Sequence, residues 1–306
     1  MKILFCSDGS REAEKAVRFG APIAAACQAD PSILGIAEKA EAEEVLLKSL
    51  RRVQDIFKKN NVEAKVITRV GRPVREIVKC TEENHYDLVV IGAMNKKDFR
   101  RLFDPVVMSV QAYTIIESVE PPVLVVSGGN PPLRRILLCT GGAEYIDKAI
   151  GLTGKIAQCA NAVVDLVHVM PEVPAMYADL VQFEEDVDRV LESNSKLGLA
   201  LRHQKDLLEK LGVFGEVRLR QGEVVPELLK EMQRTPYDLV VSGSMPAEET
   251  LRKYVMGDVA REILERVDLP VLIIRTGQKL HFVNFFRDLL GRLFRSTTRS
   301  SEALNS

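Results

Sequence analysis

The chain has 306 residues, enough for about two domains of ordinary size. Apolar residues make up 46% and charged residues 28%, which is typical of a globular protein, and the net charge of −1 argues against a general nucleic-acid-binding surface. No apolar run reaches the roughly 18 residues of a membrane span, and the run from Ile3 to Cys6 is too short for a secretory signal. We therefore expect a cytoplasmic protein that binds no nucleic acid.

The first half alternates short apolar strands with helical patterns. The sequence predicts strands at residues 2–7, 32–37, 63–70, 86–92 and 122–126, and helices at residues 11–26, 40–59, 73–84 and 105–118. The strands are rich in Val, Ile and Leu throughout, as in a sheet that helices cover on both faces. Strands separated by helices of this length form βαβ units, and right-handed crossovers then give a doubly wound parallel sheet.

The second half repeats the first. Residues 71–94 match residues 222–245, and both segments contain the motif Tyr-Asp-Leu-Val-Val-x-Gly-x-Met. Residues 3–9 match residues 136–142, and the closing strands of the two halves match in the same order. Such self-similarity indicates a duplicated domain.

The predicted fold is therefore α/β, with two tandem doubly wound domains, each built on a five-stranded parallel sheet. The first domain is expected at residues 1–129 and the second at residues 133–276, with a turn-rich linker between them. Residues 277–306 fall outside the repeat and are expected to form an amphipathic helix and a disordered tail.

The helix of this last segment lies between Phe282 and Phe294. Its apolar side chains occupy one half of a helical wheel and its polar side chains the other. So short a helix needs a surface to dock on. Three surfaces stay open: the protein's own domains or a second copy of the chain, an anionic membrane at its inner face, or an unknown partner protein.

Three motifs of the first half, which the second half repeats with substitutions, resemble the universal stress protein family. They are the opening Ile-Leu-Phe-Cys-Ser-Asp-Gly-Ser, the Tyr-Asp-Leu-Val-Val-x-Gly strand, and the closing Pro-Val-Leu-Val-Val. The resemblance implies an adenine-nucleotide α-hydrolase-like fold in both halves. In the nucleotide-binding branch of this family an Asp after the first strand contacts adenosine. A loop of the form G-x2-G-x9-G-[S/T] after the fourth strand holds the phosphates, because glycines let backbone N–H groups approach them.

The first half keeps the start of such a site. Asp8, Gly9 and Ser10 stand after its first strand, and Gly92 opens its loop. Asn95 stands at the second glycine position, where it tolerates a left-handed backbone. Ser109 stands where the family pattern has its last glycine.

The second half departs elsewhere. Gly141 stands where the family has its Asp, while Gly243 and Gly257 keep two loop glycines. Pro246 replaces the middle glycine and removes an N–H donor. Asp258 replaces the loop hydroxyl; its carboxylate would repel phosphate, so we expect it to cap the last helix instead.

Family members commonly dimerise by pairing their closing strands edge to edge. By resemblance, the strand from Pro122 to Val126 would pair with the strand from Pro270 to Ile274 within this one chain. The pairing would cover two sheet edges that otherwise invite aggregation. A homodimer of such pseudo-dimers stays open.

Other polar and thiol residues favour structural roles. None of the five cysteines forms a Cys-x-x-Cys pair, so we expect buried thiols rather than metal or redox chemistry. His168 is expected to lie in a strand, with its ring hydrogen-bonded in a structural role rather than a catalytic one. No motif of a nucleotide-hydrolysing, esterase, zinc-protease or dinucleotide-binding enzyme occurs.

The sequence thus favours a non-catalytic stress-response module, a tandem pseudo-dimer that serves interactions while its nucleotide sites are degenerate. Three alternatives stay open. One half binds ATP or AMP and acts as a sensor, the protein hydrolyses ATP slowly, or the last helix makes it a membrane-associated regulatory accessory.

Overall fold

A computed structural model describes residues 1–37, 39, 43–93, 110–128, 132–141, 147–171, 187–244 and 257–275. Residues Met1–Thr276 form one compact unit. The segment from Phe282 to Phe294 therefore lies outside the described residues, as do Asn95 and Ser109. In the described part of the chain, no helix is long and apolar enough to span a membrane.

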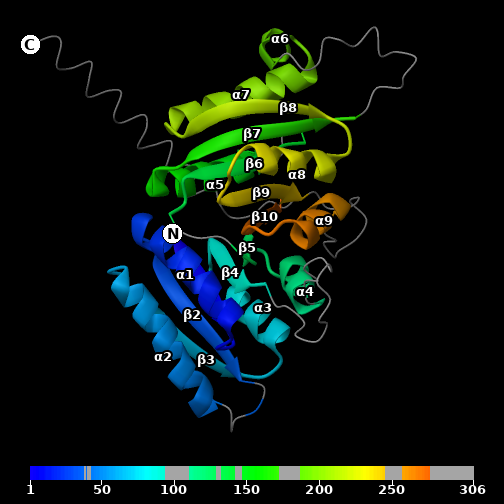
Figure 1. The fold of residues 1–306 in the computed structure, drawn as a ribbon. Helices are drawn as coiled ribbons and strands as arrows, with labels where there is room; N and C mark the ends of the chain where they lie inside the picture. Colours follow the sequence, from blue (N-terminus) through cyan, green and yellow to red (C-terminus); the bar gives the residue numbers. More distant parts are fainter. Residues whose placement is uncertain are drawn as a thin grey trace, which may run out of the picture. The chain divides into compact units, whose positions relative to one another are not determined.

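The first half alternates strands and helices as predicted (Figure 1). Its elements are β1 (Lys2–Ser7), α1 (Arg11–Ala26), β2 (Asp30–Ala37), α2 (Glu43–Lys59), β3 (Lys65–Val70), α3 (Pro73–Glu83), β4 (Leu88–Gly92), α4 (Val110–Ser118) and β5 (Val123–Val126). The second half follows the same plan with one added short helix. Its elements are β6 (Arg135–Cys139), α5 (Asp147–Ala160), β7 (Val163–Met170), α6 (Val187–Glu192), α7 (Lys196–Lys210), β8 (Phe214–Gln221), α8 (Val224–Arg234), β9 (Leu239–Ser244), α9 (Asp258–Arg266) and β10 (Val271–Arg275).

Four strand starts in the first half differ from the prediction by one or two residues. The strands expected from residues 32, 63, 86 and 122 begin at Asp30, Lys65, Leu88 and Val123. Before β4, the Asp87 carboxylate accepts the Lys2 N–H at 2.7 Å, and the Asp87 N–H donates to the Lys2 carbonyl. The second half repeats this contact, since Asp238 accepts the Arg135 N–H at 2.9 Å. The repeated Tyr-Asp pair thus fixes where the central strands begin.

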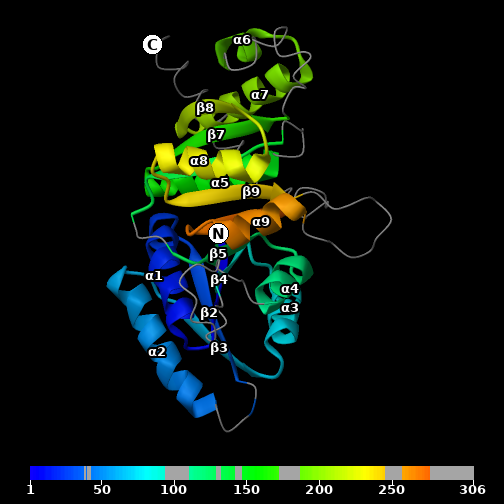
Figure 2. The ribbon, with the colours of Figure 1, turned by 45° about the vertical axis from the view of Figure 1, so that its right-hand side comes forward.

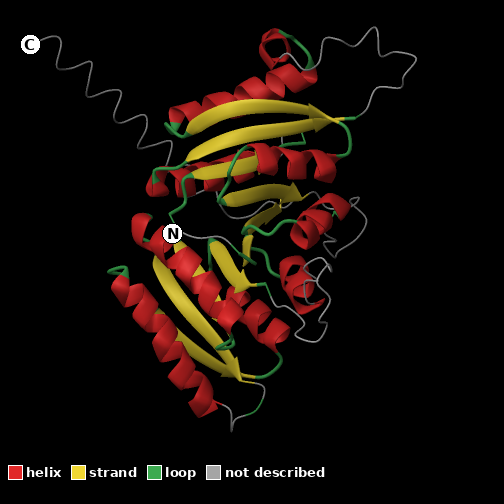
Figure 3. Cartoon of the chain, in the orientation of Figure 1, coloured by secondary structure: helices red, strands yellow, loops and turns green. Residues whose placement is uncertain are grey.

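All described strands belong to one ten-stranded sheet, in the order β3-β2-β1-β4-β5-β10-β9-β6-β7-β8. Within each half the strands are parallel and follow the same doubly wound order. Helices α1, α2, α5 and α7 cover one face of the sheet and α3, α4, α8 and α9 the other (Figures 2 and 3). The strands at the centre of the sheet are buried from end to end, which explains their continuous apolar sequence.

The two halves join through their closing strands, as the resemblance implied. Strands β5 and β10 are antiparallel, with Leu124 opposite Leu272 and Val125 opposite Val271. An apolar cluster runs across this junction and includes residues of α3, α4, α8 and α9. Since both strands gain a neighbour, neither half leaves its closing edge unpaired.

Polar contacts reinforce the junction beside the strands. The Tyr113 hydroxyl donates to Glu265 at 2.8 Å, and the Arg261 guanidinium lies over the Tyr113 ring, 5.2 Å from its centroid. Burial, followed by the neighbouring Glu265 carboxylate, raises the pKa of Tyr113, so its hydroxyl remains a donor. The Ser127 hydroxyl donates to the Leu269 carbonyl at 3.0 Å.

Candidate functional site

A cavity of about 290 Å³ lies in the first half, where β1 and β4 end beside each other. The chain leaves these two neighbouring strands toward opposite faces of the sheet, and such a switch point is where open α/β sheets bind ligands. Apolar side chains provide most of the wall: Leu34, Ile36, Pro73, Ile77 and Ile91. Asp8 and Ser10 add polar groups at one side.

The loop after β1 fixes the Asp8 carboxylate at this cavity. Its Oδ1 atom accepts the Ser10 N–H at 2.9 Å, while the exposed side chain leaves Oδ2 without a hydrogen-bond partner among the described residues. The Ser10 hydroxyl accepts the Ala13 N–H at 3.2 Å and so caps α1. One carboxylate oxygen thus sets the turn and the other remains available for a ligand.

Both glycines predicted for the first-half site also have packing reasons. Gly9 has a φ of +79°, and a Cβ there would lie 2.5 Å from the Ser49 hydroxyl oxygen on α2. A Cβ on Gly92 would lie 2.6 Å from the backbone carbonyl of Glu12, in the first turn of α1. Gly92 therefore lets α1 sit closely over the end of β4, which itself shapes the cavity.

We expect Gly92→Ala to destabilise the protein by about 1–3 kcal/mol, because the added methyl group meets backbone atoms that cannot rotate away. Gly141→Ala is the matched control: a Cβ there meets nothing within 4 Å among the described residues, so the cost should stay within about 0.5 kcal/mol. Urea unfolding followed by circular dichroism measures both. Equal stability of the two variants would contradict the packing role.

The predicted residues of the second half do not line this cavity. Gly243 lies in β9, and Gly257 is the N-cap of α9. The prediction that Asp258 caps this helix is wrong by one residue. Asp258 is the first helical residue, because the extended backbone of Gly257 already makes the turn into α9. There the carboxylate still complements the helix dipole.

His168 occupies a structural position, as the sequence indicated. Its Nδ1 atom lies 2.8 Å from the Thr140 carbonyl oxygen, which bridges the ends of β7 and β6. Among the described ranges, no group of three or more His, Cys, Asp or Glu side chains could hold a metal ion.

Comparison with known proteins decides the family. The sequence model of the universal stress protein family matches residues 1–127 and again residues 132–275. The chain belongs to the universal stress protein family. Comparison with curated proteins gives no match to this chain.

Two solved structures share the tandem fold. A universal stress protein from Archaeoglobus fulgidus is 17% identical, with a TM-score of 0.70, over 90% of this chain and 98% of the other. A functionally unknown protein from Pseudomonas aeruginosa is 14% identical, with a TM-score of 0.62, over 97% of each chain. At these identities the likeness concerns the fold alone.

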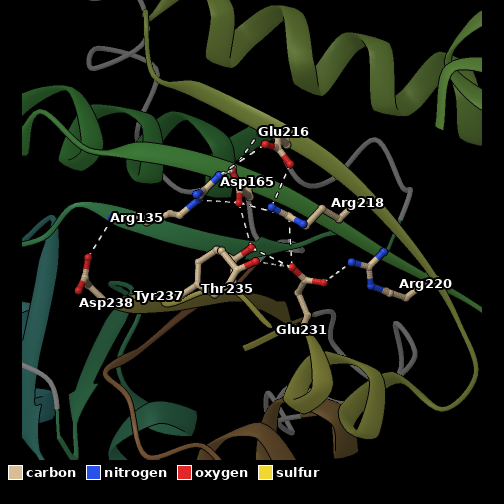
Figure 4. A network of polar contacts seen from close by, with 9 residues as sticks. All are labelled: Arg135, Asp165, Glu216, Arg218, Arg220, Glu231, Thr235, Tyr237 and Asp238. Carbon is tan, nitrogen blue, oxygen red and sulfur yellow. Dashed lines mark hydrogen bonds and ion pairs between the residues drawn. The ribbon is translucent and has the colours of Figure 1, made fainter. Parts of the chain in front are cut away.

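The second universal stress protein domain contains a buried ion network that the sequence did not reveal (Figure 4). Asp165, in β7, has no exposed surface. Its carboxylate accepts from Arg135 at 2.9 Å, from the Tyr237 hydroxyl at 2.9 Å and from the Glu216 N–H at 3.1 Å. Arg218 approaches it at 3.4 Å. The hydrogen bond to Asp165 raises the pKa of Arg135, so this guanidinium stays charged.

Glu231, on α8, is the second fully buried carboxylate. It pairs with Arg218 at 3.2 Å and with Arg220, and it accepts from the Thr235 hydroxyl at 3.2 Å. Figure 4 shows how Arg218 lies between this carboxylate and Asp165. Each of the two buried carboxylates thus has several donors, and the network serves the packing of α8 on the sheet.

The first universal stress protein domain has uncharged residues at the positions that match Asp165, Arg218 and Glu231. The strand register makes Ser32 the counterpart of Asp165, and Ile67 the counterpart of Arg218. The repeat makes Cys80 the counterpart of the second buried carboxylate. The two domains therefore stabilise the same helix–sheet contact by different chemistry, and only comparison of the repeats position by position could have revealed this.

Proposed function

We propose that this universal stress protein binds an adenine nucleotide in its first domain, without catalysis, while its second domain is structural. The observation that carries the proposal is the cavity beside β1 and β4, with the Asp8 carboxylate at its side. Its volume of about 290 Å³ is near the lower end of small-molecule sites, which suits a nucleoside better than a larger ligand.

The residues present fit an adenosine group. Apolar walls from Leu34, Ile36 and Ile91 suit a purine ring, and the Oδ2 atom of Asp8, which has no partner among the described residues, can accept hydrogen bonds from ribose hydroxyls. Ser10 begins α1 beside the cavity, so the positive end of that helix dipole favours a nearby anion.

The second domain lacks the acceptor. Gly141 stands at the position of Asp8 and provides no side chain for a ribose. This difference supports a single site per chain. The sequence by itself favoured an interaction module with degenerate sites; the cavity at Asp8 is the reason to prefer the nucleotide-binding alternative for the first domain. We keep the interaction role for the paired domains as a whole.

Isothermal titration of the full chain with AMP and with ATP tests the proposal. We expect Asp8→Asn to weaken binding by about 10–100-fold, because a hydrogen bond to a charged group contributes about 1.5–3 kcal/mol. The amide oxygen still accepts the Ser10 N–H, so the loop keeps its shape while the ribose acceptor is lost.

Asp55→Asn is the matched control, since Asp55 is exposed on α2 and pairs only with Lys58 in the described contacts. It should bind like the wild type. Absence of binding to the wild-type protein at millimolar nucleotide would refute the proposal, as would equal affinity of the Asp8 variant. Phosphate release from ATP above a buffer blank would refute the non-catalytic part.

A further inference from the structure

Two cysteines from different domains meet where α1 and α5 end. Cys27 directly follows α1 as its C-cap, and Cys159 lies in the last turn of α5. The two helices contact each other, and their carboxyl ends lie side by side (Figures 1 and 2). The two thiols lie close enough for each to shift the pKa of the other, and both residues are half-buried rather than buried as the sequence suggested.

The duplication explains why these residues meet. Helices α1 and α5 are equivalent elements of the two domains, and each is followed by a left-handed residue, Gln28 with φ of 48° and Asn161 with φ of 54°. In the repeat, Cys27 aligns with Ala160 and so lies one position from the counterpart of Cys159. The junction through β5 and β10 brings the two helix ends together and places one thiol from each beside the other.

The surroundings activate one member of the pair. The hydrogen bond from Cys27 and the positive charge of Lys155, one turn earlier on α5, lower the pKa of Cys159 to about 7. The same hydrogen bond, with burial, raises the pKa of Cys27. A substantial fraction of Cys159, about half at pH 7, is therefore thiolate, with a protonated partner beside it, as in reactive cysteine pairs.

The other three cysteines contrast with this pair. Burial raises the pKa of Cys139 to about 12 and also raises that of Cys6, both of which lie in central strands. Cys80 is fully buried, and burial raises its pKa as well. These thiols remain protonated and serve as internal references for reactivity.

We propose that Cys27 and Cys159 form a reversible disulfide that covalently joins the two universal stress protein domains when the chain meets hydrogen peroxide. The Cys159 thiolate attacks one peroxide oxygen, so that an S–O bond forms, the O–O bond breaks and the departing hydroxide takes a proton from solvent to become water. The Cys27 sulfur then attacks the sulfenic sulfur. The S–S bond forms, the S–O bond breaks, and the hydroxyl leaves as water with the Cys27 proton. Two thiols are oxidised and one peroxide is reduced to two waters.

Thiol counting with peptide mapping on the wild-type full chain tests this directly. The chain is unfolded and its free thiols are labelled with a maleimide mass tag. We expect five labelled thiols in the reduced protein and three after treatment with peroxide. Mapping should find a single cross-link between Cys27 and Cys159, and dithiothreitol should restore the count to five. A count that stays at five, or a cross-link between any other pair, overturns the proposal.

Single variants assign the roles. Cys27→Ser should leave a sulfenic acid at Cys159 that dimedone traps, while Cys159→Ser should lose the reaction. Cys139→Ala is the control and should still close the cross-link. In the reduced wild type, iodoacetamide should label Cys159 first, with a rate that is half-maximal near pH 7. Dimedone labelling of Cys27 in preference to Cys159 would reverse the assignment and contradict the account.

Discussion

Replacing Asp165 with alanine is expected to destabilise the protein by about 3–5 kcal/mol, the largest loss from any single polar change that we predict. The carboxylate has no exposed surface and accepts from Arg135, Arg218 and Tyr237. Its removal takes a buried counter-charge away from the guanidinium groups of Arg135 and Arg218, which are only 31% and 19% exposed. Urea unfolding followed by circular dichroism measures the loss.

Glu216→Ala is the matched control. Glu216 contacts the same two arginines, but its side chain is 59% exposed, so its removal should cost no more than about 1 kcal/mol. Equal losses for the Asp165 and Glu216 variants would contradict the buried network as a source of stability.

The first domain suggests a converse experiment. Asp165→Ser, Arg218→Ile and Glu231→Cys together transplant the uncharged set of the first domain into the second. The triple change removes both buried carboxylates and the arginine between them, but it leaves Arg135 and Arg220. The first domain also has a basic residue at each of these two positions, Lys2 and Arg69. Because Arg218 is removed together with its partners, we expect a loss no larger than that of the Asp165 variant. A loss larger than that of the single variant would indicate that the equivalence of the two domains at these positions is wrong.

Truncation of the leucines at the domain junction is the second large effect. Leu124 and Leu272 are almost fully buried and directly opposite in the antiparallel pair. Each change to alanine should cost about 2–5 kcal/mol. Since the two side chains are cross-strand neighbours, the double variant should deviate from the sum of the single losses by at least about 0.5 kcal/mol.

Leu50 provides the control for this double-mutant cycle. It is fully buried on α2, remote from the junction. Leu50→Ala combined with Leu272→Ala should be additive within about 0.5 kcal/mol. Additive losses for Leu124 and Leu272 themselves would mean that the closing strands do not pair in this register.

The sequence was sufficient for the repeat and the order of elements, because these depend on apolar periodicity and on matching blocks. The pairing of the closing strands was implied by the family resemblance. It could not provide what depends on distances between segments. Gly92 resembled a ligand glycine, yet its missing side chain also makes room for the first turn of α1. The contact of Cys27 with Cys159 joins residues far apart in the chain that no local spacing connects.

The buried ion network of the second domain is the other feature that the sequence could not provide. Arg218 and Arg220 alternate along β8, and Glu231 lies on the buried side of α8. Taken alone, each pattern resembles an ordinary solvent-facing charge. Only the packed structure shows that these arginine and glutamate side chains contact one another. Their ion pairs then offset the free-energy cost of burying the charges.

The location of a bound nucleotide tests the central claim most directly. Titration of ¹⁵N-labelled full chain with AMP, followed by amide resonances, compares equivalent glycines of the two domains in one sample. We predict saturable shifts for Gly9 and Gly92 in the first domain, with their counterparts Gly142 and Gly243 in the second unchanged. Shifts confined to the second domain, or none in either at millimolar AMP, would contradict a single nucleotide site at Asp8.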